Sequence, residues 1–325
     1  MYSWGVDQVA QLGHGERTPD QPTDPDRDVQ EQKYQDWKKS KLERLFPRRL
    51  DPSSLPWRQR DPGSAVRLIG CGSDFCFACV SGSAPNSHET WGCGLNGDFQ
   101  LGLSMNSEAE ATWACISALS GVKVVQIYGG GQHVVALDAN GGVWSWGHGE
   151  RTGHGSKDKH IKAPRQISAE AFAGLRVMQV RAGGSHTLAC TNNGDVFTWG
   201  TGGMFQLGNV PRDVNNFKRE ERDVQVGPDE ATPYMVSSKS LNEKFVVMAD
   251  GGSQHSVLLA WTGESGVRAK RKRENATKTD TSSPVTPRRS KRPRLVIDPE
   301  VLAACLKELE DAKRIKYDRS ALDDL

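Results

Sequence analysis

The chain has 325 residues and a formal net charge of +2. No apolar run approaches the roughly 20 residues that span a bilayer, so we expect neither a membrane partner nor a hydrophobic leader. Seven cysteines, an odd number without a disulfide framework, fit a reducing compartment and not a small disulfide-stapled secreted domain. The charge is uneven, because residues 268–294 carry eleven Lys/Arg against two acidic residues, a balance of +9 that leaves −7 elsewhere.

The chain opens on a short strand that ends in Trp4-Gly5, and a Gln-Leu-Gly loop follows at residues 11–13. This pattern is the second half of a unit that returns further along, so the strands expected before it are missing. Residues 16–62 are polar, punctuated by prolines and too long for an ordinary loop, which predicts an insertion. Residues 28–46 of this insertion could form a short helix.

One sequence unit is then written twice between residues 122 and 207. It opens with glycines, a polar residue and a histidine, continues as apolar alternation, turns at glycine, and gives a second strand that ends in Trp-Gly. His133 and His186 are 53 residues apart, and so are Trp146 and Trp199. Equal spacing at both anchors indicates a repeated structural unit.

Four short strands in about 50 residues are typical of a propeller blade. The indole of each Trp-Gly step can fill the space between packed sheets, and the glycine lets the backbone turn beside it. An earlier unit begins at Val66 and is expected to end in Trp91-Gly92. A last opening strand at 251–260 has no second strand after it, and we expect it to pair with residues 2–4 and close the ring.

Four cysteines gather in the unit that begins at Val66: Cys71, Cys76, Cys79 and Cys93. Their single C-x-x-C invites a zinc site. Cys76 and Cys79 lie an odd number of residues apart in a predicted strand, so their side chains should face opposite sides. We therefore favour buried or unpaired thiols, with a zinc site as the alternative, and expect no metal and no cofactor.

The composition shifts after Trp261. Residues 263–297 are charged, rich in Ser, Thr and Pro and nearly free of large apolar groups, which predicts a disordered basic tail. Asp298-Pro299-Glu300 then has the N-cap, first-turn proline and acidic residue of a helix start, so an amphipathic helix is predicted over 298–317. The expected organisation is a propeller over 1–262, including the insertion at 16–62, followed by this tail and helix.

The tail contains two basic clusters with the spacing of a bipartite nuclear import signal, which can also contact DNA phosphates. They consist of Lys270, Arg271, Lys272 and Arg273, and of Arg288, Arg289, Lys291 and Arg292. We therefore expect a nuclear import receptor as a partner and the nucleus as the location. Phosphorylation at Ser283 or Thr286, each followed by proline, would lower the positive charge between the clusters.

The Gly-Gly-x-His strand opening, the Trp-Gly strand end and the Gln-Leu-Gly loop together resemble the regulator of chromosome condensation family of seven-bladed propellers. The insertion resembles the switchback loop of the chromatin-bound guanine nucleotide exchange factors in that family. The resemblance implies that one propeller face releases nucleotide from a Ran-type small GTPase without covalent chemistry. It also implies that the opposite face binds nucleosomes.

Particular residues follow from this resemblance. His133 and His255 match strand-opening histidines that line the exchange face, and Asp74 occupies the aligned place in the earlier unit. An alternative is that such histidines only satisfy backbone groups where a blade opens, as we expect for His186.

The insertion supplies the nucleosome residues that the resemblance implies. Arg44 matches the Leu-Glu-Arg-Leu position that meets the acidic patch of the histone dimer, where a guanidinium can bond carboxylates bidentately. Lys39 and Lys41 are its expected neighbours. The alternative is a solvated basic loop.

Two functions from different classes stay open. The first is a nuclear exchange factor for a Ran-type GTPase, docked on chromatin and supporting nucleocytoplasmic transport and mitosis. The second is a non-catalytic propeller scaffold of the same superfamily. Seven blades of about 50 residues need about 350, and the body supplies some 260. We therefore predict an all-β, incomplete propeller of about four blades, without part of the GTPase-contacting surface.

Overall fold

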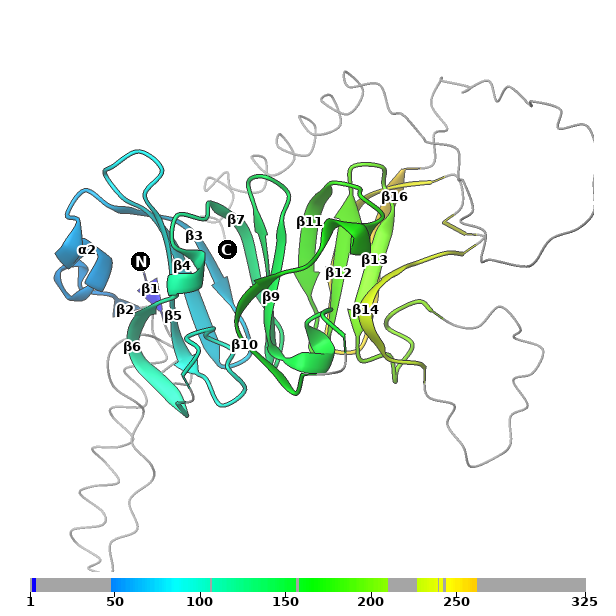
Figure 1. The fold of residues 1–325 in the computed structure, drawn as a ribbon, viewed down its shortest axis with the longest axis horizontal. Helices are drawn as coiled ribbons and strands as arrows, with labels where there is room; N and C mark the ends of the chain where they lie inside the picture. The colour runs from blue at the N-terminus through cyan, green and yellow to red at the C-terminus, as the bar shows by residue number, and fades with distance from the viewer. Residues whose placement is uncertain are drawn as a thin grey trace, which may run out of the picture. The chain divides into compact units, whose positions relative to one another are not determined.

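The computed structural model describes residues 2–3, 48–105, 107–155, 158–209, 227–238, 240–241 and 244–261. The chain divides after Thr262 into two units, and all described residues belong to the first (Figure 1). No helix among them is long and apolar enough to cross a membrane. The predicted basic tail, its import signal, the helix at 298–317 and residues 4–47 of the predicted N-terminal region lie outside the described residues.

Three blades are complete four-stranded antiparallel sheets in which consecutive strands are neighbours. Blade 1 consists of β3 (Ala65–Cys71), β4 (Phe75–Ser81), β5 (His88–Leu95) and β6 (Ala109–Cys115). Blade 2 consists of β7 (Val124–Gly129), β8 (His133–Asp138), β9 (Val143–His148) and β10 (His160–Gln166). Blade 3 consists of β11 (Val177–Ala182), β12 (His186–Thr191), β13 (Val196–Gly200) and β14 (Glu230–Met235).

Two half-blades complete the described part of the chain. One pairs β1 (Tyr2–Ser3) with β2 (Arg48–Arg49), and the other pairs β15 (Phe245–Gly251) with β16 (Ser256–Trp261). Short 3-10 helices η2 (Ser117–Leu119), η3 (Gly149–Arg151) and η4 (Ala169–Phe172) lie in the connections. The prediction of an all-β propeller of about four blades is confirmed.

The blades pack face to face, which explains their strongly apolar second strands. Every residue of β8 and of β12 is buried, because a neighbouring blade covers each face of the sheet. The first strands β3, β7, β11 and β15 contact one another from blade to blade. Close approach there requires glycine: a Cβ on Gly70 of β3 would lie 2.5 Å from the carbonyl oxygen of Ile127 in β7.

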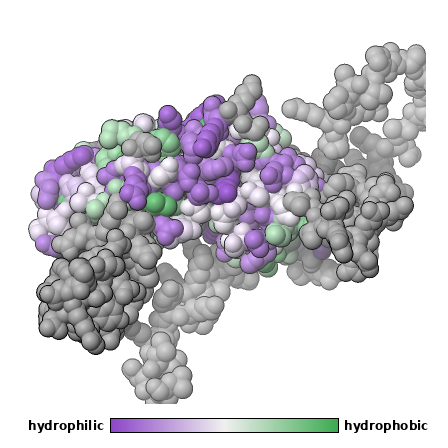
Figure 2. All heavy atoms as spheres, turned by 90° about the horizontal axis from the view of Figure 1, so that it is seen from below, coloured by the Kyte–Doolittle hydropathy of each residue, from purple (hydrophilic) through white to green (hydrophobic). Residues whose placement is uncertain are grey.

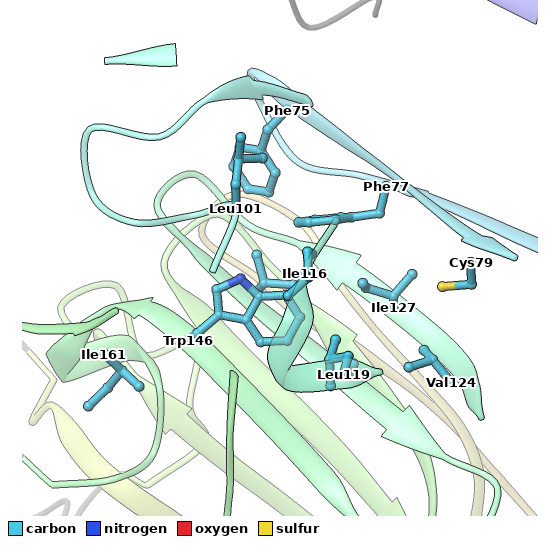
Figure 3. Packing of buried hydrophobic residues seen from close by; sticks show 12 residues of the cluster. Phe75, Phe77, Cys79, Leu101, Ile116, Leu119, Val124, Ile127, Trp146 and Ile161 are labelled. Atoms are coloured by element: carbon cyan, nitrogen blue, oxygen red, sulfur yellow. The ribbon is translucent and has the colours of Figure 1, made fainter. Parts of the chain in front are cut away.

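The Trp-Gly step and the Gln-Leu-Gly loop meet across the interface of blades 1 and 2. The Trp146 ring is fully buried among side chains of blade 1, with Phe77 edge-on at 5.9 Å and Leu101 in the same cluster (Figure 3). Its indole Nε1 donates a hydrogen bond to the carbonyl oxygen of Gln100 at 2.6 Å. The repeated motifs are therefore two sides of one contact between successive blades.

The Trp-Gly step predicted at Trp91-Gly92, in the third strand of blade 1, is wrong by two residues. Gly94, Gly147 and Gly200 share a φ of 103 to 105°, a left-handed conformation that favours glycine, and each faces the first residue of the second strand. The equivalent of Trp146 is therefore Cys93. Trp91 corresponds to Trp144. Aligning Trp91 with Trp146 therefore matched one tryptophan with another, although the register was wrong by two residues.

The predicted closure of the ring by residues 2–4 and 251–260 is also wrong for the described residues. Tyr2 pairs with Arg49 and Ser3 with Arg48, while β16 pairs with β15. This register matches the third and fourth strands of blade 2, where Trp144 pairs with Gln166. The short fourth strand was missed because an Arg-Arg pair carries no apolar alternation.

The end of the predicted insertion packs onto blade 1 instead of extending as a polar loop. Residues 50–61 include the 3-10 helix η1 (Pro52–Ser54) and the helix α2 (Pro56–Arg60). Trp57 of α2 is 1% exposed, with ring centroids 5.6 Å from Trp91 and 5.5 Å from Trp113. A single indole thus anchors a segment whose composition looked polar.

Candidate functional site

A row of tight turns joins the first and second strands of successive blades, and we call it the rim. It consists of residues 72–74, 130–132, 183–185 and 252–254. Backbone hydrogen bonds connect the turns from blade to blade: the amide of Ser73 donates to Gly130, and the amide of Gly131 to Gly184. The amide of Gly184 in turn donates to Gly252 at 3.0 Å. The rim is therefore continuous across four sheets.

His133 lies beneath the rim and not on it. Its imidazole is fully buried, and its Nε2 is 2.9 Å from the hydroxyl of Thr187 in the next blade. Burial, followed by the charge of Arg151, lowers the pKa of His133 to about 3. The side chain is therefore neutral and joins blades 2 and 3.

His186 repeats this arrangement one blade further on. Its Nε2 is 2.9 Å from the Ser256 hydroxyl, and burial lowers its pKa to about 4, with the neighbouring His255 adding to the effect. The structural role expected for His186 thus has a specific geometry: an imidazole in one blade and a hydroxyl in the next.

The other two predicted exchange residues reach the surface. Asp74 is half-buried in the first turn, where its carbonyl oxygen accepts a hydrogen bond from Leu95. His255 is exposed beyond the fourth turn. The structure therefore leaves Asp74 half-buried and His255 exposed at opposite ends of the rim, while His133 is buried beneath it.

A polar chain that includes Gln132 of the rim was not predicted from the sequence. Gln132 donates from Nε2 to Asp98 of blade 1 at 2.8 Å and accepts from Arg151 at 2.5 Å. His160 stands 3.7 Å from the same carboxylate of Asp98. Arg151 lies in a loop that departs from the repeat, and Asp98 occupies a position of the repeated loop that holds Met204 in blade 3, so periodicity carried no signal. The one available hint was Arg151-Thr152-Gly153, which replaces Gln-Leu-Gly.

Two imidazoles flank this polar chain. His148 and His160 have ring centroids 5.8 Å apart, and burial followed by Arg151 lowers the pKa of His148. Asp98 and Arg151 therefore give the polar chain one negative and one positive charge, next to side chains that can donate or accept hydrogen bonds.

The view from below in Figure 2 shows a mainly hydrophilic surface over the described residues. Within those residues no group of three or more His, Cys, Asp or Glu could hold a metal ion.

The first strands carry a second set of interacting groups at equivalent positions. The Arg181 guanidinium lies 4.3 Å from the ring centroid of Tyr128 and its Nε lies 3.9 Å from the Asp250 carboxylate. These three residues come from three successive sheets, so they form a short row along the inner strands.

The predicted nucleosome residues Arg44, Lys41 and Lys39, and both basic clusters of the import signal, lie outside the described residues. By register, β1 and β2 are a third and a fourth strand. The insertion therefore occupies the loop position that residues 96–108 and 149–159 occupy in blades 1 and 2.

Tandem four-stranded sheets, joined by Trp-to-loop contacts and histidine-to-hydroxyl contacts, define a repeat-built β-propeller protein. The family model described as "Regulator of chromosome condensation (RCC1) repeat" matches residues 87–137, 140–190 and 193–259. A second model of the same description matches 124–151 and 177–206. The chain belongs to the regulator of chromosome condensation (RCC1) repeat family.

Its relatives are varied. The human E3 ubiquitin-protein ligase HERC2 is 31% identical over 237 residues, covering 64% of this chain and 5% of HERC2. Protein pim1 of Schizosaccharomyces pombe is 27% identical over 306 residues, covering 87% of this chain and 47% of pim1. The chain thus spans about half or less of the length of these relatives.

Solved structures show the same fold. The structure of Prp20p from Saccharomyces cerevisiae, described with its binding properties to Gsp1p and histones, superposes with a TM-score of 0.57 at 18% identity. The match covers 79% of this chain and 50% of Prp20p.

Proposed function

We propose that the chain promotes nucleotide release from a Ran-type small GTPase while docked on chromatin in the nucleus. The observation that carries this proposal is the continuous rim, which holds Asp74 and His255 at the surface beside the chain of Asp98, Gln132 and Arg151. The partners described for Prp20p, Gsp1p and histones, support the same class of partner here.

Promotion of release needs differential binding and no covalent step. A surface that binds the nucleotide-free GTPase more tightly than the loaded form shifts the population towards release. Rim carboxylates can compete with phosphate for the basic groups of a phosphate-binding loop, and Arg151 can pair with a carboxylate of the partner. His133 acts in this scheme as a positioning residue, because its buried imidazole holds blade 3 against blade 2.

Release of a fluorescent GDP analogue from a Ran-type GTPase tests the proposal. We expect the chain to accelerate release, and Asp74→Asn and His255→Ala each to slow it about tenfold, equivalent to roughly 1.4 kcal/mol of transition-state stabilisation. Glu170→Gln is the matched control, since Glu170 is exposed in the connection between the fourth and first strands, at the other end of the blades. Absence of acceleration, or an equal loss in the control, would contradict the proposal.

Chromatin docking and import are tested separately. Arg44→Ala should weaken binding to nucleosomes more than Lys39→Ala or Lys41→Ala, because only a guanidinium bonds a carboxylate bidentately. Nucleosomes with a neutralised acidic patch should bind wild type and Arg44→Ala alike. A fluorescent fusion of residues 263–297 should enter nuclei, and replacing Lys270 to Arg273 by alanine should prevent entry.

A scaffold without exchange activity is the second candidate. The observation in its favour is an apolar surface on β16, where Val257 is 62% and Leu259 50% exposed. HERC2, a ubiquitin ligase, shows that the same repeats occur in a protein of another class. A chain that binds the GTPase or other proteins but leaves the release rate unchanged would favour the scaffold.

A further inference from the structure

The strands of the first hairpin in blade 1 each place a cysteine next to the turn. Cys71 is the last residue of β3 and Cys76 the second residue of β4, and they are direct partners across the hairpin. Their sulfur atoms are 3.5 Å apart. The same two positions in the other sheets hold Gly129 with Val134, Ala182 with Thr187, and Gly251 with Ser256. The thiol pair is therefore particular to blade 1 among the described sheets.

The backbone at this pair suits a disulfide. The Gly72 amide donates to the Phe75 carbonyl at 2.8 Å, so the next pair inward, Cys71 with Cys76, is a non-hydrogen-bonded pair of the ladder. Such pairs have Cα atoms about 4.5 Å apart and side chains on one face, within the range that disulfides span. Closing the sulfur separation then needs side-chain rotation and no movement of the strands.

The two thiols differ in exposure, since Cys71 is exposed and Cys76 is half-buried. Cys71 is exposed, and the hydrogen bond from the Cys76 thiol lowers the pKa of Cys71 to about 7 against the effect of burial. Burial instead raises the pKa of Cys79 to about 11, and it raises that of Cys115 together with the charge of Glu89. Of Cys71, Cys79 and Cys115, the exposed Cys71 is therefore the thiol that ionises most readily near neutral pH.

We propose that Cys71 and Cys76 are a reversible oxidation site that forms an intrahairpin disulfide with hydrogen peroxide as the oxidant. The Cys71 thiolate attacks one peroxide oxygen, which yields a sulfenic acid and hydroxide that takes up the proton released by the thiol. The Cys76 thiol then attacks the sulfenic sulfur and water leaves. Two thiols and one peroxide thus give one disulfide and two waters, and a dithiol reductant reverses the change.

The position of the pair gives the modification a structural consequence. The disulfide would clamp the ends of residues 72–75, the turn that carries Asp74 on the rim. The corresponding turns of the other sheets have only backbone hydrogen bonds across these ends. Oxidation should therefore reduce amide exchange with deuterium in residues 72–75 more than in residues 130–133.

The experiment treats the full chain with increasing peroxide, blocks remaining thiols with iodoacetamide and maps the peptides by mass spectrometry. We expect a Cys71–Cys76 crosslink, two hydrogens lighter than the dithiol, which dithiothreitol reverses. Cys76→Ser should leave Cys71 as a sulfenic acid that dimedone traps, and Cys71→Ser should leave Cys76 alkylated. Cys115→Ser is the control and should form the crosslink at the wild-type peroxide dose.

Three results would overturn the proposal. The first is complete alkylation of both thiols after peroxide treatment. The second is a dominant bond between Cys76 and Cys93, which is the Cys76 partner on β5. The third is an equal dimedone yield at Cys71 and Cys115, which would make Cys71 an ordinary thiol.

Discussion

The interfaces on the two sides of blade 2 solve the same packing problem with different chemistry. Between blades 1 and 2 the strand-opening residue is Phe75, which packs in one apolar cluster with Val134. Between blades 2 and 3 the equivalent residue is His133, which is 2.9 Å from the hydroxyl of Thr187. The fold therefore requires a buried ring and a matching partner at this position, and not a histidine as such.

A second position shows the same contrast. Gln126 of blade 2 bonds both the amide of Val180 and the carbonyl of Met178 in blade 3, at 2.9 and 3.0 Å. The equivalent residue of blade 1 is Leu68, which packs against the apolar cluster between blades 1 and 2. At these two positions the interface of blades 1 and 2 is held by apolar burial, and that of blades 2 and 3 by groups that must stay paired.

The largest expected effect is on the apolar interface. Trp146→Ala removes a fully buried indole and its hydrogen bond to Gln100, and should lower the free energy of unfolding by about 3–5 kcal/mol. Urea unfolding followed by circular dichroism measures the loss. Trp144→Ala, at a half-buried ring on the same strand, should cost clearly less. Equal losses would show that the interface is not organised around Trp146.

The second prediction converts one interface into the other. Thr187→Val alone leaves a buried imidazole without its partner and should cost about 1–3 kcal/mol. His133→Phe alone should also destabilise, because the Thr187 hydroxyl loses its bond. The double variant recreates the Phe75–Val134 pair, so it should be more stable than the sum of the two losses. A double-mutant cycle from urea unfolding measures this coupling, and additive losses would reject it.

The third prediction uses pH to separate the interfaces. The folded pKa of His133, about 3, lies below its unfolded value near 6.5, so the unfolded chain binds the proton first. The stability that the neutral imidazole contributes is present above about pH 6.5 and is lost as pH falls towards 3. The slope approaches about 1.4 kcal/mol per pH unit. The double variant that combines His133→Phe with Thr187→Val should lose stability less steeply between pH 6.5 and 5, and an unchanged slope would contradict the assignment.

The smallest expected effect concerns Gln126. Gln126→Leu copies the residue of blade 1 but leaves the Val180 amide and the Met178 carbonyl without their partner in blade 2. It should cost about 0.5–1.5 kcal/mol in urea unfolding. Leu68→Gln in the apolar interface is the reciprocal change. If Gln126→Leu is neutral while Leu68→Gln is costly, the amide contributes nothing and only apolar contact matters at this position.

Much of the fold could be predicted because a blade is a local pattern. Apolar alternation and glycine turns are visible within a few residues, and the 53-residue spacing of His133 and His186 identified the repeat. Of the candidate site, only the turns between first and second strands could be predicted from the sequence. Asp74 and His255 could be placed on them by alignment, whereas Gln132 and Arg151 could not be connected to Asp98 from a pattern.

Local periodicity was thus enough to predict the blades, since each strand's sequence repeats with the geometry of a single sheet, while the recurring Gly-Gly-x-His, Trp-Gly and Gln-Leu-Gly motifs carried the resemblance to the family. Contacts between sheets decided the rest. They buried His133 against Thr187 while leaving His255 exposed, and they packed Trp57 on blade 1. These contacts form between residues that are tens of positions apart in the sequence. Neither the alternation of apolar residues nor their spacing along the chain predicts which residue each buried side chain will contact.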